Sequence, residues 1–507
     1  MLSPDTIKQY LARTLADYDW IKGFTGPQFD SDLAALNPQP DLNKLWLHQK
    51  ACFLLLLELK RFMLFLDMGG GKTNITLQLL KYRKERGEQP KAIVFVPYIT
   101  SVDTWVEECA KHTPSLKCQP LVAGTAANLA SLSEQADLYV ICYQSAVAML
   151  SKKESDGWSL KAADVRAKFP GFDTLVCDEI HRCKSATSLT FRMCRAISAQ
   201  CEYVLGLTGT PFGRDLGDLW PQFYLIDFGA TLGNTFALYR ESFFTKKAKY
   251  WGGYEYCFKQ KMLPQLKQTI KNASISYTID EFADMPPKDY VVQHIEPPEE
   301  SLGYTQSSTK LLRDAIKSGD YKAVQSNYLR LRQLSSGFLT LHADDSDKLQ
   351  VQFNQNPKLD ALAELIEDMP ATSKAVIFHH FIYTNKLISD KLKSMKVKHA
   401  RIWGGQRDPI GELRKFKTDD KCRVLVINWK SGSSSLNLQG ANYLIVFEQP
   451  ESPIDRKQGE ARVWRPGQTQ RVIIYDLLVK NTVDSRLHKA NECGKELLRE
   501  LLDGKEL

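Results

Sequence analysis

Short runs of apolar residues, rich in β-branched side chains, recur along both halves of the chain and alternate with stretches of helical periodicity. In the first half these runs are Phe62–Leu66, Ala92–Val96, Leu138–Cys142, Thr174–Cys177 and Tyr203–Leu207. In the second half they are Ala375–Phe378, Val397–Ile402, Val424–Asn428, Tyr443–Phe447 and Val472–Tyr475. Strands that are apolar on both faces and are separated by helices are typical of parallel sheets covered by helices on both sides. The pattern therefore predicts an α/β protein with two parallel-sheet lobes.

Between the two series of apolar runs, residues Pro211–Pro370 show no strand rhythm, and we expect a largely helical insertion there. Its polar segment "DDSDKLQVQFNQNPKL" is predicted to be an exposed loop. The expected organisation is a helical segment and linker at 1–43, a first lobe at 44–285, and a second lobe at 286–507 with a helical entry at 298–340. Proline punctuation near residue 286 marks the crossing between the lobes.

The first lobe is expected to carry a basic, aromatic-rich insertion at residues 239–271, with eight Lys or Arg against two Glu. Two interpretations of this insertion stay open. Lys246, Lys247 and Lys249 would neutralise nucleic-acid phosphates while aromatic rings pack on sugars or bases. Alternatively, the aromatic residues form a small core and the lysines are its solvated face.

Composition narrows the class of protein without deciding the function. A hydrophobic content of 43% and a charged content of 25% are those of an ordinary soluble globular protein. The net charge of +8 permits an anionic partner without requiring one. The 11 cysteines form no CxxC pair, so neither a zinc site nor a disulfide framework is expected. No signal peptide or apolar run of membrane-spanning length is evident, and we expect a cytoplasmic protein, or a nuclear one if its source is eukaryotic.

The stretch "FMLFLDMGGGKTNITLQLL" has the order strand, glycine turn, helix that is typical of a phosphate-binding loop. The backbone N–H groups of such a loop converge on phosphates, a lysine reaches the outer phosphates, and a hydroxyl binds Mg²⁺. The candidate ATP-binding residues are Gly69, Gly70, Gly71, Lys72 and Thr73. The common form of this loop has a further glycine at the position that Leu66 occupies here.

An acidic pair follows a second apolar run in "FDTLVCDEIHRCKS". At the tip of a buried strand, Asp178 can hold Mg²⁺ while Glu179 orients and deprotonates the attacking water. A solvated acidic pair at a strand end is the alternative, but His181 completes the more particular pattern D-E-x-H. Thirty residues later, "LGLTGTPFGRDLGDLW" ends another apolar run in small hydroxyl residues and a glycine, which we expect close to the acidic pair.

The last candidate element is "RKQGEARVWRPGQTQRV". Gln458, Arg462 and Arg465 are spaced so that one helix face could present all three. Positive charge at the γ-phosphate accelerates phosphoryl transfer, and these residues are predicted to supply it. A basic, solvated helix is the alternative.

These blocks, in this order, resemble the superfamily-two helicases, and specifically the Swi/Snf-type ATPases that translocate on double-stranded DNA. The resemblance covers roughly Leu45 to Leu487 and implies two RecA-like lobes, ATP and Mg²⁺ as cofactors, and DNA as partner. That family's phosphate loop also lacks the early glycine, so Leu66 is compatible with a working site. "LWLHQK" is similar to the family's adenine-reading segment and implies a role for Gln49. "SGSSSLNLQGANYLIVFE" is similar to the block that touches DNA, which implies nucleic-acid contacts by Lys430 and Ser431.

The chain also departs from the family pattern. Ser433, Ser435 and Ala461 replace family glycines, and "ISYTIDEF" replaces an Arg-Arg-Lys brace near the lobe crossing. The effect of these replacements on activity and regulation is open. The chain has no room for a chromatin-reading module, which favours a compact bacterial or phage-like member.

The leading functional hypothesis is an ATP-driven motor that moves along duplex DNA without lasting strand separation. A strand-separating or annealing helicase that acts on forked or branched DNA is the second enzyme hypothesis. A nucleic-acid-binding protein with a vestigial ATP site is the third, and the joint presence of Lys72, Asp178, Glu179, Arg462 and Arg465 argues against it. The sequence does not indicate a pathway, protein partners or an oligomeric state.

Overall fold

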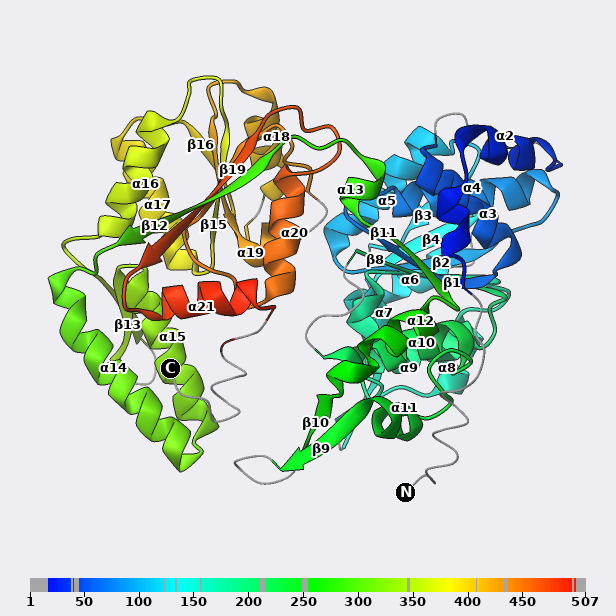
Figure 1. The fold of residues 1–507 in the computed structure, drawn as a ribbon, viewed down its shortest axis with the longest axis horizontal. Helices are drawn as coiled ribbons and strands as arrows, with labels where there is room; N and C mark the ends of the chain where they lie inside the picture. The colour runs from blue at the N-terminus through cyan, green and yellow to red at the C-terminus, as the bar shows by residue number, and fades with distance from the viewer. Residues whose placement is uncertain are drawn as a thin grey trace. The chain divides into compact units, whose positions relative to one another are not determined.

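The structure is a computed structural model that describes residues 17–37, 40, 45–122, 124–132, 135–155, 157–209, 215–248, 254–343, 347–406, 408–432, 436–494 and 497. The chain divides into two compact units (Figure 1). The first unit consists of Met1–Lys247 and Glu255–Ala283, and the second of Ala248–Tyr254 and Asp284–Leu507.

The first unit is built on a seven-stranded sheet in the order β11-β1-β8-β7-β2-β4-β3, in which every pair is parallel. Its strands are β1 (Arg61–Leu66), β2 (Ala92–Val96), β3 (Cys118–Pro120), β4 (Leu138–Cys142), β7 (Thr174–Asp178), β8 (Tyr203–Thr208) and β11 (Ser274–Tyr277). All five apolar runs predicted as strands in this half of the chain are strands of this sheet.

Helices cover both faces of the first sheet, which explains why its strands are apolar throughout. Within β1, Met63 and Phe65 join the core on one face, whereas Phe62, Leu64 and Leu66 join the core on the other. The latter face is covered by η1 (Asp19–Gly23), α2 (Gly26–Ala34), α3 (Leu47–Glu58), α4 (Lys72–Glu85) and α5 (Ile99–His112). The opposite face is covered by α6 (Thr125–Ser131), α7 (Tyr143–Leu150), α8 (Ala162–Lys168), α9 (Leu189–Ser198), α10 (Leu219–Asp227), α11 (Phe236–Phe243) and α12 (Leu263–Ile270).

The second unit contains a six-stranded parallel sheet in the order β12-β19-β18-β15-β17-β16. Its strands are β12 (Lys288–Ile295), β15 (Ala375–His379), β16 (His399–Ile402), β17 (Val424–Asn428), β18 (Tyr443–Val446) and β19 (Val472–Val479). One face packs on α16 (Pro357–Asp368) and α17 (Ile382–Ser394), and the other on α18 (Pro409–Thr418), α19 (Trp429–Gly432) and α20 (Pro453–Val463). The predicted fold class, two parallel-sheet lobes, is therefore confirmed.

The expectation for Pro211–Pro370 is only partly right. The stretch is mostly helical and includes the predicted helical entry, α14 (Glu299–Ser318) and α15 (Tyr321–Ser335). It also contributes the edge strands β11 and β12, the pair β9 (Phe244–Ala248) and β10 (Tyr254–Phe258), and the antiparallel pair β13 (Phe338–Ala343) and β14 (Asp347–Gln352). β14 lies in the segment predicted to be an exposed loop, which is a correction. Its polar residues concealed a strand, because in the described part of the chain β14 pairs with β13 alone and its apolar residues Leu349 and Val351 are exposed.

The basic aromatic insertion is a helix followed by a two-stranded hairpin, β9 (Phe244–Ala248) and β10 (Tyr254–Phe258). Tyr239, Phe243 and Phe244 are buried in the core of the first unit, whereas Lys246 and Lys247 on β9 are exposed. Most of the described aromatic rings therefore form a core with lysines on its solvated face. Tyr254 is the exception, with 62% of its surface exposed. Lys249 lies outside the described residues.

A small antiparallel pair, β5 (Lys152–Glu154) and β6 (Gly157–Ser159), and the helix α21 (Val483–Glu492) complete the architecture. Across the described part of the chain, no helix has both the length and the apolar character that crossing a membrane requires.

The packing around Gly206 in β8 generates a prediction for stability. A Cβ atom at this position would lie 2.4 Å from Met63 Sδ and 2.7 Å from Ile180 Cδ1, both in the buried core. We expect Gly206→Ala to lower the free energy of unfolding by about 1–3 kcal/mol, because overpacking a dense core displaces its neighbours. Chemical denaturation measures the change.

Gly303→Ala is the matched control, because Gly303 lies inside α14 and a Cβ atom there meets nothing within 4 Å. This variant should gain roughly 0.5–1 kcal/mol from helix propensity. Equal stability of the two variants would contradict the packing described for β8.

Candidate nucleotide site and arginine motif

The phosphate loop connects β1 to α4. β1 ends at Leu66, α4 begins at Lys72, and the φ angles of Gly69 and Gly71 are +85° and +78°. These left-handed conformations are the reason for glycine at those two positions. Leu66 is fully buried and still belongs to the strand, so no glycine is required there. The loop is closed by a hydrogen bond from Gly70 N to Asp67 O at 3.1 Å.

Lys72 lies at the base of this loop. Its ammonium donates to Leu66 O at 2.6 Å and to Asp67 O at 3.4 Å. Its positive charge favours the ionised forms of Asp178 and Glu179. Thr73 follows in the first turn of α4, beside Lys72. The predicted triphosphate-binding residues are thus together at the N-terminus of a helix, where anions are stabilised.

Gln49 contacts the loop from α3. Its amide nitrogen donates to Gly70 O at 3.3 Å, and its amide oxygen accepts from Trp46 N at 3.2 Å. An amide has two N–H groups and two lone pairs, so one donor and one acceptor remain for a purine edge. The neighbouring His48, which no sequence motif indicated, is within 2.8 Å of Gly70 O through Nε2.

The acidic pair lies at the carboxyl end of β7, and four elements hold it. Trp105 Nε1 of α5 donates to Asp178 Oδ2 at 3.0 Å, and Thr208 Oγ1 of β8 donates to Glu179 Oε2 at 2.9 Å. His181 Nδ1 lies 3.2 Å from the same Glu179 oxygen. Glu179 has a φ of +51°, an uncommon conformation for a residue with a side chain and one that concentrates at functional sites.

Burial and the charge of Glu179 raise the pKa of Asp178 above its usual range. Burial also acts against ionisation of Glu179, but the hydrogen bond and charge of His181, the charge of Lys72 and the hydrogen bond from Thr208 outweigh it and lower the pKa of Glu179. Glu179 is therefore the more acidic member of the pair. A second cation at this site would relieve the repulsion that raises the pKa of Asp178.

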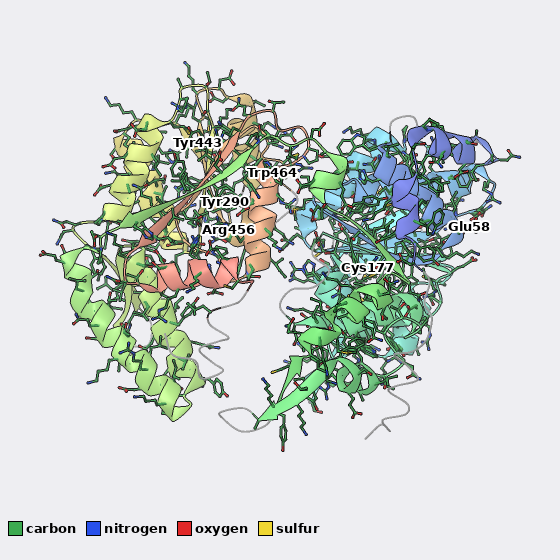
Figure 2. The ribbon with its side chains drawn as sticks, in the orientation of Figure 1. Glu58, Cys177, Tyr290, Tyr443, Arg456 and Trp464 are labelled. Carbon is green, nitrogen blue, oxygen red and sulfur yellow. The ribbon has the colours of Figure 1, made fainter. Side chains whose placement is uncertain are left out.

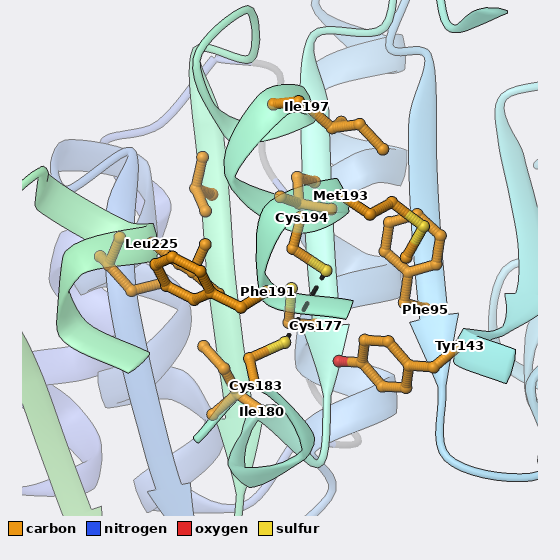
Figure 3. Packing of buried hydrophobic residues seen from close by; sticks show 14 of the residues in the cluster. Phe95, Tyr143, Cys177, Ile180, Cys183, Phe191, Met193, Cys194, Ile197 and Leu225 are labelled. Carbon is orange, nitrogen blue, oxygen red and sulfur yellow. Dashed lines mark hydrogen bonds between the residues drawn. The ribbon is translucent and has the colours of Figure 1, made fainter. Parts of the chain in front are cut away.

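A dense core lies directly behind the acidic pair and fixes the end of β7. Cys177, Cys183 and Cys194 are fully buried there with the ring of Tyr143 (Figure 3). The sulfur atoms of Cys183 and Cys194 are 3.7 Å apart, and Cys183 belongs to the short helix η2 (Ile180–Cys183) that follows Glu179. The backbone on both sides of the acidic pair is thus held by close packing.

Gly209, directly after β8, lies against the start of the phosphate loop, and Thr208 lies close to the acidic pair, as the sequence led us to expect. A Cβ atom on Gly209 would be 3.0 Å from Leu66 O. Thr208 bonds to Glu179, so the end of β8 touches both the loop and the acidic pair. Thr210 and Pro211 lie outside the described residues.

The arginine motif lies in the second unit on α20 and the turn that follows. Gln458 is buried in the helix, and Arg462 is in its last turn. The helix ends at Val463, so Arg465 lies beyond it and the prediction of one helix face for all three residues is wrong. The cause is Pro466, because the residue before a proline is disfavoured in the helical conformation. Gly467 completes the turn with a φ of +99°.

Strong contacts fix α20 against the sheet of the second unit. Arg456 forms two hydrogen bonds to Asp476 of β19, at 2.5 and 2.8 Å, and a third to Glu460 at 2.6 Å. Trp464 Nε1, just after the helix, donates to Pro286 O at 2.9 Å. Arg456 and Trp464 are labelled in Figure 2. The arginine motif is thus presented by a rigid element.

Gln468 organises the turn after Arg465. Its amide nitrogen donates to the carbonyl oxygens of Gln439 and Ala441 at 2.9 and 2.8 Å, and its oxygen accepts from two backbone N–H groups. Ala461, which replaces a family glycine, is half-buried within α20.

The predicted nucleic-acid residues of the second unit follow β17. Lys430 is exposed on α19, and its backbone N–H is bonded to Asn428 Oδ1 at 3.0 Å. Ser431 is the next residue of this short helix. Ser433 and Ser435 lie outside the described residues.

The described residues contain no cluster of three or more His, Cys, Asp or Glu side chains able to hold a metal ion. A Mg²⁺ ion in a nucleotide site needs no such cluster, because it is usually held by one or two protein oxygens, substrate phosphates and water. Asp178 Oδ1 and the Thr73 hydroxyl are the candidate protein ligands.

The family profile for the SNF2-related domain matches residues 48–340, which is more than half of the chain. The chain belongs to the SNF2-related family. A profile for the helicase conserved C-terminal domain matches residues 357–467. The family resemblance inferred from the motifs is thereby confirmed.

Relatives of this SNF2-related chain come from distant sources. The ATP-dependent helicase FUN30 of Saccharomyces cerevisiae is 23% identical over 505 residues, which cover 83% of this chain and 43% of the yeast protein. Putative protein p41 of Acyrthosiphon pisum secondary endosymbiont phage 1 is 23% identical over 468 residues, covering 88% of this chain and 95% of that protein. This chain therefore spans less than half of the yeast relative.

Among solved structures, the Sulfolobus solfataricus SWI2/SNF2 ATPase core in complex with dsDNA is similar, with 19% identity and a TM-score of 0.41. The similarity covers 91% of this chain and 93% of that one.

The contact between Trp105 and Asp178 generates a prediction for this SNF2-related site. Trp105→Phe keeps an aromatic ring in the core but removes the N–H donor. We expect the Mg²⁺ concentration for half-maximal ATP hydrolysis to rise on the order of tenfold, because groups that orient a metal ligand typically contribute this much to metal affinity. A titration of ATPase rate against Mg²⁺ measures it.

Trp429→Phe is the control, because the Trp429 indole donates a comparable buried hydrogen bond, 2.7 Å to Glu448 O in the second unit. An unchanged Mg²⁺ requirement in Trp105→Phe would show that the indole does not position Asp178.

Proposed function

We propose that this chain is an ATP-driven motor that hydrolyses ATP to ADP and phosphate while translocating on double-stranded DNA. The observation that carries the proposal is the assembly in the first unit. The glycine loop and Lys72 follow β1, Asp178 and Glu179 lie at the end of β7, and β8 is the strand between β1 and β7. Lys72, Asp178 and Glu179 are each held by a hydrogen bond. Ligands of parallel sheets bind at such strand ends.

The contacts of Lys72 and Glu179 support distinct roles in hydrolysis. Lys72 holds the outer phosphates of ATP and neutralises charge there. Glu179 accepts a hydrogen bond from the attacking water and orients it toward the γ-phosphate. Because the pKa of Glu179 is lowered, its carboxylate is a weak proton acceptor. Glu179 therefore contributes to hydrolysis more by orienting the attacking water than by removing its proton.

Thr73 and Asp178 would hold Mg²⁺. The ion, when bound with ATP, would neutralise charge that develops on the phosphates. Gln49 would read the adenine edge with its remaining donor and acceptor.

Arg462 and Arg465 of the second unit would supply positive charge to the γ-phosphate when the two units close on ATP. We infer that duplex DNA bound by both units promotes this closure. Lys430 and Ser431 would contact DNA from the second unit, and Lys246 and Lys247 from the first.

A strand-separating helicase acting on forked or branched DNA is the second candidate, and one observation favours it. The hairpin of β9 and β10 carries Lys246, Lys247 and the exposed Tyr254. Cationic side chains beside an exposed ring suit contact with a phosphate backbone and an unpaired base.

The deciding experiment measures ATP hydrolysis by the full chain with single-stranded, duplex and forked DNA and with RNA. The proposed function predicts stimulation by duplex DNA. A triplex-displacement assay then detects translocation, and unwinding of a labelled fork detects strand separation. Displacement without unwinding supports the translocase, and unwinding supports the helicase. Absence of nucleotide-dependent activity on every substrate would refute both.

Lys72→Ala and Glu179→Gln should both abolish turnover but should differ in ATP binding. Loss of the ammonium removes phosphate contacts and weakens ATP affinity. Glu179→Gln keeps the phosphate contacts, but its neutral amide cannot replace the carboxylate that orients the attacking water, so ATP stays bound and is not hydrolysed. Equilibrium binding of a fluorescent ATP analogue measures the difference. Equal loss of ATP affinity in both variants would contradict the assigned roles.

Arg465→Ala should leave ATP and DNA binding mostly intact but remove most DNA-stimulated hydrolysis, a loss on the order of 10³-fold from arginine-finger chemistry. Its residual rate should hardly respond to DNA. Arg471→Ala is the control, because Arg471 is an exposed arginine of the same unit that pairs with Asp289. Full stimulation of Arg465→Ala by duplex DNA would refute the two-unit mechanism.

A further inference from the structure

The last segment of the first unit, Tyr277–Phe282, ends two residues before the second unit begins at Asp284. It contains the end of β11 and the one-turn helix α13 (Ile279–Phe282). β11 pairs with β1 along Met63–Leu66, so the segment runs beside the strand that enters the phosphate loop. A capping box between Thr278 and Glu281 starts the helix, and Lys22 pairs with Glu281 at 3.1 Å.

Asp67, the first residue of the phosphate loop, is bonded to this segment twice. Its backbone N–H donates to Tyr277 O at 3.1 Å. Its carboxylate oxygen Oδ2 accepts the backbone N–H of Ile279 at 3.0 Å, across 212 residues of sequence. The carboxylate thereby satisfies an N–H group at the start of α13 that has no partner within the helix. One side chain connects the loop to the segment that leads into the second unit.

A stacked pair of rings makes a second, independent connection. The rings of His48 and Phe282 are 4.4 Å apart with an interplanar angle of 22°. His48 is buried, and its Nε2 is 2.8 Å from Gly70 O, in the middle of the loop. Phe282 also lies over Gly70, since a Cβ atom there would be 3.4 Å from its ring. A displacement of Gly70 therefore displaces His48 or Phe282.

We propose that Asp67, His48 and Phe282 are positioning residues. They hold the phosphate loop in the conformation that binds nucleotide, and through them bound nucleotide fixes the position of the segment that leads into the second unit. The inference rests on the proposed ATP-binding function and adds a route by which nucleotide reaches the second unit. Only Ala283 separates Phe282 from Asp284, so a shift of α13 acts directly on the start of the second unit. Nucleotide bound to the loop fixes Gly70 and thereby fixes α13.

Nucleotide binding without DNA tests the positioning role by a readout that does not depend on turnover. We expect Asp67→Ala and Phe282→Leu each to weaken binding of a fluorescent ADP analogue on the order of tenfold, since an unpaired buried polar group or a lost ring contact costs enough for such a change. Asp67→Asn retains a side-chain oxygen for Ile279 N–H and should bind nearly as the unaltered chain does. Tighter binding by both Asp67 variants would overturn the inference, because it would mean that the carboxylate only repels phosphates.

Phe53→Leu is the matched control for lost aromatic packing. Phe53 lies on α3, as His48 does, and its ring packs on Tyr82 at 5.7 Å instead of on the loop. Its substitution should leave nucleotide affinity unchanged. An equal loss of affinity in Phe53→Leu and Phe282→Leu would overturn the inference by showing a general effect of weakened packing.

Hydrogen exchange tests the transmission. Adding ADP to the unaltered chain should slow amide exchange in residues 277–283, and this protection should be lost in Asp67→Ala at an ADP concentration that still saturates the site. Unchanged exchange in this segment, or equal protection in the variant, would overturn the inference while leaving the proposed function intact. Absence of nucleotide binding by the unaltered chain would instead refute the proposed function and the inference with it.

Discussion

Two carboxyl groups, Asp178 and Glu179, lie side by side in a poorly solvated position, and the surrounding structure offsets the resulting repulsion. Adjacent buried carboxylates destabilise a fold unless donors or cations accompany them. The chain supplies an indole N–H from α5, a hydroxyl from β8, an imidazole from η2 and an ammonium from α4. These donors come from four elements, so the acidic pair keeps its geometry only when the whole first sheet is assembled.

Strand order brings those elements together. β8 lies between β1, which carries the phosphate loop, and β7, which carries the acidic pair. β8 ends at Thr208 and is followed by Gly209. The small size of these residues lets the loop and the acidic pair approach each other, since a Cβ atom on Gly209 would lie 3.0 Å from Leu66 O. A bulky residue there would separate the lysine from the carboxylates. The sheet therefore determines the distance between the phosphate-binding and water-orienting groups.

The central strands could be predicted from sequence because burial on both faces produces a continuous apolar run. Three edge strands, β3, β11 and β12, could not be predicted, whereas the edge strand β16 lies within the predicted run Val397–Ile402. β11 has four residues, and β12 exposes Tyr290, Val291 and Val292, so neither has the composition of a strand buried on both faces. Residues 239–271 left two interpretations open because a basic aromatic composition fits both, and only the three-dimensional packing of Tyr239 and Phe243 shows that these rings belong to a core.

In the nucleotide site, the glycine loop and the acidic pair could be predicted because their chemistry needs particular residues at particular spacings. Trp105 donates a hydrogen bond to Asp178, which is 73 residues away in the sequence. His48 contacts Gly70 of the loop, which is 22 residues away. Trp105 and His48 lie in segments that are similar to family blocks, but the sequence does not indicate which group either side chain contacts, and only folding gives its N–H group a partner. The course of the chain at Arg465 was mispredicted for a local reason, since periodicity favoured a continuing helix and Pro466 ends it.

The proposed ATP-binding groups belong to the first unit, whereas the arginine motif belongs to the second, and this arrangement bears on how ATP could drive movement. A ligand shifts a conformational equilibrium only by binding one state more tightly than the other. Lys72 and Thr73 belong to the first unit alone and would bind ATP equally well with the units apart or together. Arg465 would favour a closed state because it belongs to the second unit, where the contacts of Arg456 with Asp476 fix the preceding helix, α20. Coupling of hydrolysis to movement would therefore depend on the arginine motif, whereas ATP affinity would depend on the loop.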